Sequence, residues 1–305
     1  MSAFIGGEGT MDEPAVAVEE VSVFPGIQLS FRDYKGEKCC IRHHAEEGVM
    51  HIHHSKDGRM GWKMNDGMTY YLGPGDLLLH MSDCCAGSEM NFPLGYHRGL
   101  SIAIDLDILT RETPEILKEA GIDGSQLYRK FFPEGRPVAM AASDKIEHIF
   151  SELYDLPDQV RLPYFKLKVQ ELILFLSMMD MPKNREMGLQ PSAQADVIRE
   201  IHQLLVAHLD QRFTIEALSK RYLINTCTLK TVFKAVYGMP IASYMKAYRV
   251  KEAARLLRET GDSIAVIAGK VGYENQSKFT KAFKDIYHVL PTEYRKGTCA
   301  QAYSD

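Results

Sequence analysis

The chain has 305 residues, of which 45% are hydrophobic and 25% are charged, with 36 Lys and Arg against 40 Asp and Glu. This composition excludes a disordered, collagen-like or low-complexity chain, and the length suits two domains of ordinary size. The longest apolar stretch, residues 172–179, is too short to span a bilayer, and the first twenty residues contain no Lys or Arg. We therefore expect a cytoplasmic protein without a secretory signal, whose six cysteines are reduced.

The charge is divided unevenly along the chain. Residues 195–298 contain 17 Lys and Arg against 10 Asp and Glu, a net charge of +7, whereas the remainder has a net charge of −11. A basic third joined to an acidic two-thirds predicts that only the C-terminal segment meets a polyanion.

Residues 21–107 have the pattern of short strands separated by turn residues. The predicted strands include residues 21–23, 38–44, 50–54, 68–72 and 77–80. Asp57-Gly58 and Asp66-Gly67 fit tight hairpin turns of type I′. Many short strands at this spacing favour a small antiparallel β-barrel.

After Pro114 the pattern becomes helical. Helices are predicted for residues 114–121, with Thr113 as cap and Gly121 as stop, then for 143–156 and 164–179. The last of these is apolar on most of its circumference, so it could bury one face in its own domain and another in a second subunit, or serve core packing alone.

The predicted organisation is therefore α+β, with a cupin-like antiparallel β-barrel at 1–110 and a helical extension at 111–185 that could hold a dimer interface. Residues 186–194 are expected to be a linker, and 195–298 an all-α domain whose first helix covers residues 196–209.

Residues 212–296 contain an approximate internal repeat. Each copy has a short helical segment, a turn, and an Asn followed four and eight positions later by apolar residues: Asn225 with Leu229 and Phe233, and Asn275 with Phe279 and Phe283. Asn is among the best helix N-caps, and the spaced apolar residues bury one stripe while the opposite face stays polar. This is the layout of a helix-turn-helix.

The motifs in this segment resemble those of the AraC/XylS family of transcription regulators. They are Ile264-Ala265-Val266-Ile267-Ala268 with Val271-Gly272-Tyr273, Lys278-Phe279 with Ala282-Phe283-Lys284, Leu290-Pro291-Thr292-Glu293-Tyr294-Arg295, and Tyr248-Arg249-Val250 with Ala253 and Leu256-Leu257. The resemblance implies two helix-turn-helices joined by a long helix at about residues 241–258. Their recognition helices would enter successive major grooves about 34 Å apart. Leu223 and His288 stand where a turn glycine is usual.

The resemblance also implies which residues read DNA bases: Cys227, Lys230 and Thr231 in the first recognition helix, and Gln276, Ser277, Lys278, Thr280 and Lys281 in the second. Gln can pair with adenine, Lys reaches guanine, and Ser or Thr contacts either edge, whereas Cys227 offers only an apolar contact to a thymine methyl. The alternative for Lys230, Lys278 and Lys281 is phosphate neutralisation without base reading.

Other segments resemble a narrower PchR-like branch that regulates siderophore uptake. They include Asn225-Thr226-Cys227-Thr228-Leu229-Lys230, Tyr71-Leu72-Gly73-Pro74-Gly75-Asp76-Leu77 and Lys166-Leu167-Lys168-Val169-Gln170-Glu171-Leu172. This resemblance implies a barrel that binds a small-molecule effector, with a ferric siderophore as the candidate. Trp62, Met64 and Tyr70 could line an apolar ligand cavity, although core packing is the alternative for each.

The N-terminal segment also contains a histidine cluster, formed by His43, His44, His51, His53 and His54. Histidines at i and i+2 share a strand face and can chelate a metal. A cupin enzyme needs a second metal-binding element, which is missing after Leu79, where the sequence continues His80-Met81-Ser82-Asp83. We therefore predict no metal, no cofactor and no catalytic site.

The favoured hypothesis is a ligand-responsive regulator that binds double-stranded DNA, with RNA polymerase and a second copy of the chain as further partners and no membrane association. Two alternatives stay open. One is a cupin-type metalloenzyme fused to a DNA-binding unit, and the other is a DNA-binding protein whose barrel only oligomerises.

Overall fold

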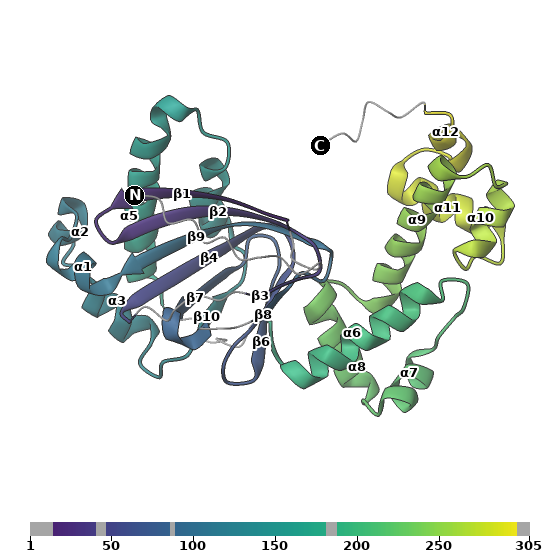
Figure 1. Cartoon of the computed structure of the whole chain (residues 1–305), viewed down its shortest axis with the longest axis horizontal. Helices are drawn as coiled ribbons and strands as arrows, with labels where there is room; N and C mark the ends of the chain where they lie inside the picture. The colour runs from purple at the N-terminus through teal and green to yellow at the C-terminus, as the bar shows by residue number, and fades with distance from the viewer. Residues whose placement is uncertain (1–14, 41–46, 86–88, 181–187, 298–305) are drawn as a thin grey trace. The chain divides into compact units, whose positions relative to one another are not determined.

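The computed structural model describes residues 15–40, 47–85, 89–180 and 188–297 (Figure 1). The chain forms two compact units, Met1–Ser192 and Ala193–Asp305. Within the described ranges, no helix is long and apolar enough to cross a membrane.

The first unit contains two antiparallel sheets. One has six strands in the order β1-β2-β9-β4-β7-β10, and the other has five in the order β11-β6-β5-β8-β3. The strands of the first sheet are β1 (Ala15–Phe24), β2 (Ile27–Lys35), β4 (Val49–Gly58), β7 (Leu77–Met81), β9 (Tyr96–Asp105) and β10 (Val138–Met140). Those of the second are β3 (Lys38–Cys40), β5 (Met60–Lys63), β6 (Met68–Leu72), β8 (Glu89–Asn91) and β11 (Leu189–Pro191).

The predicted antiparallel strands are thus present, but the prediction of a closed barrel is wrong. Each sheet is completed by a strand that follows the segment 1–110: β10 pairs with β7, and β11 pairs with β6. No pairing of described strands joins one sheet to the other. The sequence pattern identifies strands, but it does not show which distant strand covers each edge.

Helices cover the outer face of the six-stranded sheet (Figure 1). They are α1 (Leu106–Arg111), α2 (Glu115–Glu119), α3 (Gly124–Phe131), α4 (Asp144–Phe150) and α5 (Asp158–Met178), with short 3-10 turns at Ser82–Cys85 and Ser151–Leu153. The alternation of β4 shows the layering, because Met50 and Ile52 join the core under the helices while His53 faces the second sheet. A separate cluster that includes Tyr34, Trp62 and Phe92 fills the space between the sheets.

Three local predictions in this unit need correction. Asp57-Gly58 is not a hairpin turn, because β4 pairs with β7 and β9 whereas β5 pairs with β6 and β8. Asp66-Gly67 does lie in the β5–β6 hairpin, but Gly67 N–H donates to Met64 O and only Gly67 has a positive φ, which excludes type I′. The N-cap of α2 is Pro114, and Thr113 Oγ1 instead donates to Leu109 O.

The predicted linker at 186–194 is also structured where it is described. Leu189–Pro191 form β11, and α6 (Ser192–Ala207) begins directly after it. Thr69 and Ser192 share a hydrogen bond of 2.7 Å between their hydroxyl oxygens, and Ser192 N–H donates to Gly67 O. This segment is therefore held by the β5–β6 hairpin.

The second unit is helical in the part that the structure describes. It contains α7 (Ile215–Tyr222), α8 (Thr226–Tyr237), α9 (Ile241–Glu259), α10 (Ile264–Lys270), α11 (Gln276–Tyr287) and α12 (Pro291–Arg295), together with most of α6. The long helix predicted for residues 241–258 is confirmed as α9.

Candidate nucleic-acid interface

The second unit contains two copies of the same helix pair, α7–α8 and α10–α11. Both predicted caps are present: Asn225 Oδ1 accepts from Thr228 N–H at 2.7 Å, and Asn275 Oδ1 accepts from Ser277 N–H at 2.7 Å. Because an N-cap satisfies a backbone donor that the helix leaves unpaired, these two Asn residues fix where α8 and α11 begin.

The apolar stripe of each second helix is buried as predicted. Leu229, Phe233, Phe279 and Phe283 have no exposed surface. Phe233 lies against Tyr237 with ring centroids 4.6 Å apart, and Phe283 lies against Tyr287 at 4.8 Å. Burial of these large side chains holds each recognition helix on its unit by one face only.

The opposite faces of α8 and α11 carry the predicted DNA-reading residues. Seven of the eight are exposed and one is partly buried: Cys227, Lys230, Thr231, Gln276, Ser277, Lys278 and Lys281 are exposed, and Thr280 is intermediate. Cys227, Lys230 and Thr231 share a face of α8 through i+3 and i+4 spacing, as do Ser277, Thr280 and Lys281 on α11.

Two lysines extend these faces by one turn and were missed from the sequence. Lys234 and Lys284 are exposed and lie three residues beyond Thr231 and Lys281, respectively. The same i+3 spacing that identifies the other positions would have found them. With Lys230, Lys278 and Lys281 they make five lysines that form no ion pair with a described residue.

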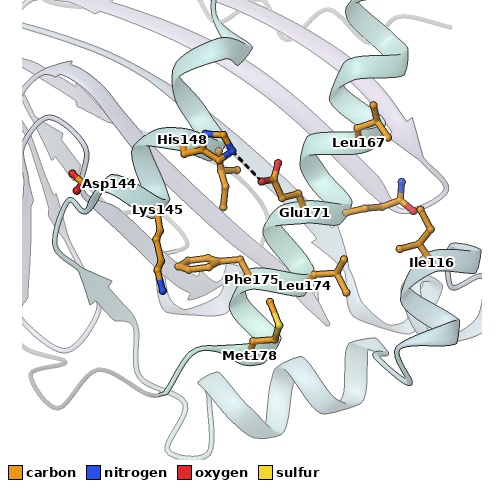
Figure 2. A pocket seen from close by; sticks show the side chains of 11 residues that line it. Ile116, Asp144, Lys145, His148, Leu167, Glu171, Leu174, Phe175 and Met178 are labelled. Carbon is orange, nitrogen blue, oxygen red and sulfur yellow. Dashed lines mark ion pairs between the residues drawn. The ribbon is translucent and has the colours of Figure 1, made fainter.

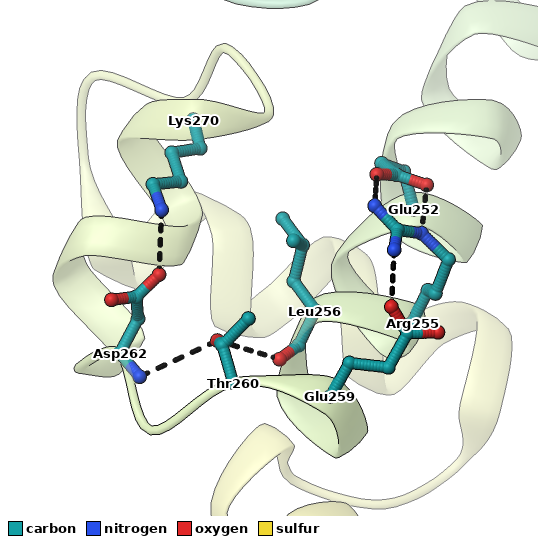
Figure 3. A network of polar contacts seen from close by, with 7 residues as sticks. All are labelled: Glu252, Arg255, Leu256, Glu259, Thr260, Asp262 and Lys270. Atoms are coloured by element: carbon teal, nitrogen blue, oxygen red, sulfur yellow. Dashed lines mark hydrogen bonds and ion pairs between the residues drawn. The ribbon is translucent and has the colours of Figure 1, made fainter.

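Two basic side chains outside the recognition helices are paired with carboxylates. Lys270 lies 2.6 Å from Asp262 and its hydrogen bond lowers the pKa of that carboxyl, while Arg255 is bonded to Glu252 and Glu259 (Figure 3). Thr260 Oγ1 donates to Leu256 O at the end of α9, and Asp262 N–H donates to Thr260 Oγ1. These contacts fix the turn between α9 and α10.

The end of α9 is also held from the far end of the unit. Arg295 Nε donates to Leu257 O at 3.3 Å, and its terminal nitrogen donates to Asp262 O at 2.6 Å. Arg249, in the middle of α9, donates to Gln211 O at 2.8 Å. Two arginines thus secure the connecting helix to the segments before and after it.

Both positions that lack the usual turn glycine adopt the left-handed conformation. Leu223, with φ +52°, ends α7, and its side chain is 94% exposed; His288, with φ +60°, ends α11. Their backbone N–H groups donate to Ser219 O and Lys284 O, so both helix ends keep the left-handed C-cap that glycine normally provides.

The histidine cluster of the first unit does not form a metal site in the part of the chain that the structure describes, because no three His, Cys, Asp or Glu side chains are placed to hold an ion. His53 and His80 instead face each other with 2.9 Å between their Nε2 atoms. His43 and His44 lie outside the described residues. Trp62, Met64 and Tyr70 are each 3% exposed in the cluster between the sheets.

Comparisons with known proteins identify the second unit. A family model described as "Helix-turn-helix domain" matches residues 218–297. The chain is 35% identical over 162 residues to the uncharacterised HTH-type transcriptional regulator YisR of Bacillus subtilis. The matched residues make up 53% of this chain and 52% of YisR. The chain is also 33% identical over 100 residues to the Transposon Tn10 TetD protein of Escherichia coli. The matched residues make up 33% of this chain and 72% of TetD.

Among solved structures, an AraC-type transcriptional regulator from Chromobacterium violaceum matches with 19% identity and a TM-score of 0.33, over 36% of this chain and 98% of that one. The chain spans about half the length of YisR. The family match, at residues 218–297, falls on the two helix pairs that carry the AraC-type motifs. The chain therefore belongs to the AraC family of helix-turn-helix transcription regulators.

Proposed function

We propose that the chain is a transcription regulator that binds double-stranded DNA by placing α8 and α11 in successive major grooves. One observation carries this proposal: two capped helices, each buried on one face, present on the other face lysines that form no ion pair with a described residue. The connecting helix α9 has 19 residues and is therefore about 28 Å long, close to the roughly 34 Å of one DNA turn.

Within this proposal the exposed residues divide between two tasks. Gln276, Ser277 and Thr231 have side chains that can bond base edges, and Cys227 can contact a thymine methyl. The five lysines without an ion pair to a described residue suit phosphates or the acceptors of guanine. Lys234 and Lys284, which are exposed one turn further along α8 and α11, extend both faces along the major groove of the DNA.

The test is a titration of the full chain onto its own upstream DNA at fixed salt. Lys281→Ala combined with Lys284→Ala is expected to weaken binding at least tenfold and to lower the slope of log K against log[salt] by about 1.8. Lys118→Ala, an exposed lysine of α2 without an ion pair to a described residue, is the charge-matched control. Unchanged affinity and slope in the double variant would exclude α11 from the interface.

We also propose that α5 pairs with α5 of a second copy. Val160, Leu167 and Met178 are 48, 60 and 76% exposed. Val160, Leu167 and the half-buried Leu174 recur every seven residues, and Met178 lies one turn beyond Leu174, as in a heptad pattern. Figure 2 shows Leu174, Phe175 and Met178 along a groove of about 560 Å³ beside α4, with the His148–Glu171 ion pair at its rim.

Sedimentation of the Leu167→Glu variant tests this pairing. The variant should be a monomer where the unmodified chain is a dimer, and equal masses would refute the pairing.

The first unit is proposed to bind the effector. The space described between its sheets is about 20 Å³, far smaller than the ferric siderophore implied by the resemblance to the PchR-like branch. This space gives no support to a siderophore. A contact with RNA polymerase stays a prediction from the family resemblance.

A further inference from the structure

The turn between α7 and α8 carries an apolar side chain at the surface of the second unit. Leu223 is 94% exposed, and its backbone is in the left-handed conformation with φ +52°. This conformation costs stability in a residue with a Cβ, because the Cβ crowds the following carbonyl oxygen. A strained residue whose side chain packs on nothing in its own unit directs attention to a contact outside that unit.

Hydrogen bonds hold this turn in one conformation. Ser219 O accepts from the backbone N–H of Leu223 and from that of Ile224. Ser219 Oγ donates to Ile224 O at 2.6 Å. Asn225, which caps α8, follows at once. Leu223 is therefore held at a fixed place beside the beginning of the first recognition helix.

The equivalent turn of the second copy is covered by its own unit. Gly272 stands there in place of Leu223 and is buried, with a backbone carbonyl oxygen only 2.1 Å from the position of a Cβ. Lys270, which stands in place of Arg221, is bonded to Asp262 (Figure 3). The first turn has neither this cover nor a carboxylate partner among the described residues.

Two cations precede Leu223 on the first copy. Lys220 and Arg221 lie in the last turn of α7, both are exposed, and neither forms an ion pair with a described residue. Two cations beside an apolar side chain complement the DNA backbone, where charged phosphates alternate with the carbon atoms of deoxyribose. The charge of this turn therefore favours DNA as its partner.

We propose that the α7–α8 turn is an additional contact with DNA, in which Leu223 packs against a deoxyribose and Lys220 and Arg221 bind the neighbouring phosphates. In a helix-turn-helix the first helix crosses the DNA backbone while the second enters the groove, and Leu223 lies between the two. Sugar and phosphate are the same in every nucleotide, so this contact adds affinity without reading sequence. The inference rests on the proposed function, because it extends the same DNA interface.

Titration of the full chain onto its own upstream DNA, together with thermal unfolding, tests the role of Leu223. Leu223→Gly should be more stable than the unmodified chain and yet bind DNA at least threefold more weakly, because it relieves the backbone and removes the apolar contact. Leu223→Met keeps an apolar side chain and should bind within twofold of the unmodified chain. DNA binding by Leu223→Gly that is as tight as that of the unmodified chain overturns the proposal.

Two further variants separate the side chain from the backbone. Leu223→Asn suits the left-handed conformation without the freedom of glycine, so it should lose as much DNA affinity as Leu223→Gly. His288→Gly is the matched control, because His288 is the other non-glycine residue with positive φ in the described ranges and follows α11 instead of preceding a recognition helix. It should leave DNA affinity unchanged. An equal loss in His288→Gly would assign the effect to helix ends and overturn the contact.

Salt dependence tests the two cations. Lys220→Gln combined with Arg221→Gln should weaken DNA binding at least tenfold and lower the slope of log K against log[salt] by about 1.8. Leu223→Gly removes no charge and should leave the slope unchanged. Each variant should keep the ratio of affinities for the upstream DNA and an unrelated duplex. An unchanged slope in the double variant, or a lower ratio in Leu223→Gly, overturns a contact with the backbone.

The same titrations separate this inference from the proposed function. DNA binding that depends on Lys281 and Lys284 but not on Leu223, Lys220 or Arg221 would overturn the turn contact and leave the regulator intact. A lower sedimentation mass of Leu223→Gly with unchanged DNA binding would overturn it as well, by assigning the turn to a contact between copies. Absence of DNA binding by the unmodified chain would overturn both.

Discussion

The two helix-turn-helices of the second unit have glycine and non-glycine residues at their left-handed turns in opposite order. Each copy needs two left-handed turns, one after its first helix and one after its recognition helix. The first copy has Leu223 and then Gly238, with φ values of +52° and +82°. The second has Gly272 and then His288, with φ values of +81° and +60°.

The difference shows that a left-handed turn does not by itself require glycine. A Cβ on Gly272 would come within 2.1 Å of Leu209 O and 3.1 Å of the Arg249 guanidinium carbon, so close contact as well as φ demands glycine there. Leu223, at the equivalent turn of the first copy, is 94% exposed and has room for its side chain. The cost at Leu223 is conformational alone, about 1–2 kcal/mol.

The largest effect is expected from Gly272→Ala, which should destabilise the second unit by about 3 kcal/mol through backbone conformation and the clash with Leu209 O. Gly238→Ala, with the same φ sign, should cost only about 1 kcal/mol. Hydrogen exchange of α9 amides in the two variants measures the difference. Similar costs would show that the contact at Leu209 relaxes freely.

A second difference is a half-buried histidine, His202, that packs on Tyr237 of the first copy and on Tyr244 of α9. His202 Nε2 lies 2.9 Å from Tyr244 Oη, and burial lowers its pKa from 6.5 to about 4. The folded state therefore binds the proton more weakly than the unfolded state. The free energy of unfolding therefore does not depend on this group above pH 6.5. It should fall by roughly 2 kcal/mol as the pH drops from 6.5 to 4, because the unfolded state then takes up the proton first.

Hydrogen exchange of α8 peptides between pH 7 and 4.5 can measure this loss. His202→Gln should be less stable than the unmodified chain at pH 7 but should lose less on acidification, whereas exposed His208→Gln should behave as the unmodified chain does. An equal pH dependence in His202→Gln would assign the acid sensitivity elsewhere.

The recognition helices also differ in the number of lysines that form no ion pair with a described residue: Lys230 and Lys234 on α8, and Lys278, Lys281 and Lys284 on α11. Replacing all three lysines of α11 by Gln should lower the salt slope of DNA binding by about 2.7, against about 1.8 for the two of α8. Titrations at several salt concentrations supply both slopes. A larger effect from α8 would place the main phosphate contact on the first copy.

The smallest expected effect is a gain in stability. Leu223→Gly should stabilise the unit by about 0.5–1 kcal/mol, because glycine adopts the left-handed conformation without a Cβ penalty. His288→Gly should gain less, since His occurs more often in this region than a branched apolar residue does. Thermal unfolding of both variants gives the order, and a loss of stability in Leu223→Gly would show that its side chain packs after all.

The second unit was predictable because its signals are local. Asn225 and Asn275 cap helices whose first turn they contact, and the apolar stripes recur within a single helix. The same locality explains why Lys234 and Lys284 should have been found. The first unit depends on contacts between distant segments. The pairing of β10 with β7 and of β11 with β6 could not be predicted, because the alternation of apolar residues within a strand does not identify its partner.

The space between the sheets shows the same limit. Trp62 was selected as an apolar residue that could line a cavity, and it does border one, whereas Met64 and Tyr70 lie elsewhere in the core between the sheets. The polar residues that line it with Trp62, Arg32 and His97 among them, were not found. Arg32 and His97 are 65 positions apart, and only the register of β2 on β9 brings them to one face.

The two hydrogen bonds of Arg295 have a consequence for the nascent chain. The first helix-turn-helix and α9 are complete in sequence once residue 259 has left the ribosome, but the carbonyl groups of Leu257 and Asp262 wait for a side chain made more than thirty residues later. During synthesis, the first copy can close while the turn that positions the second is still open. We therefore expect the first helix-turn-helix to fold before the second during synthesis.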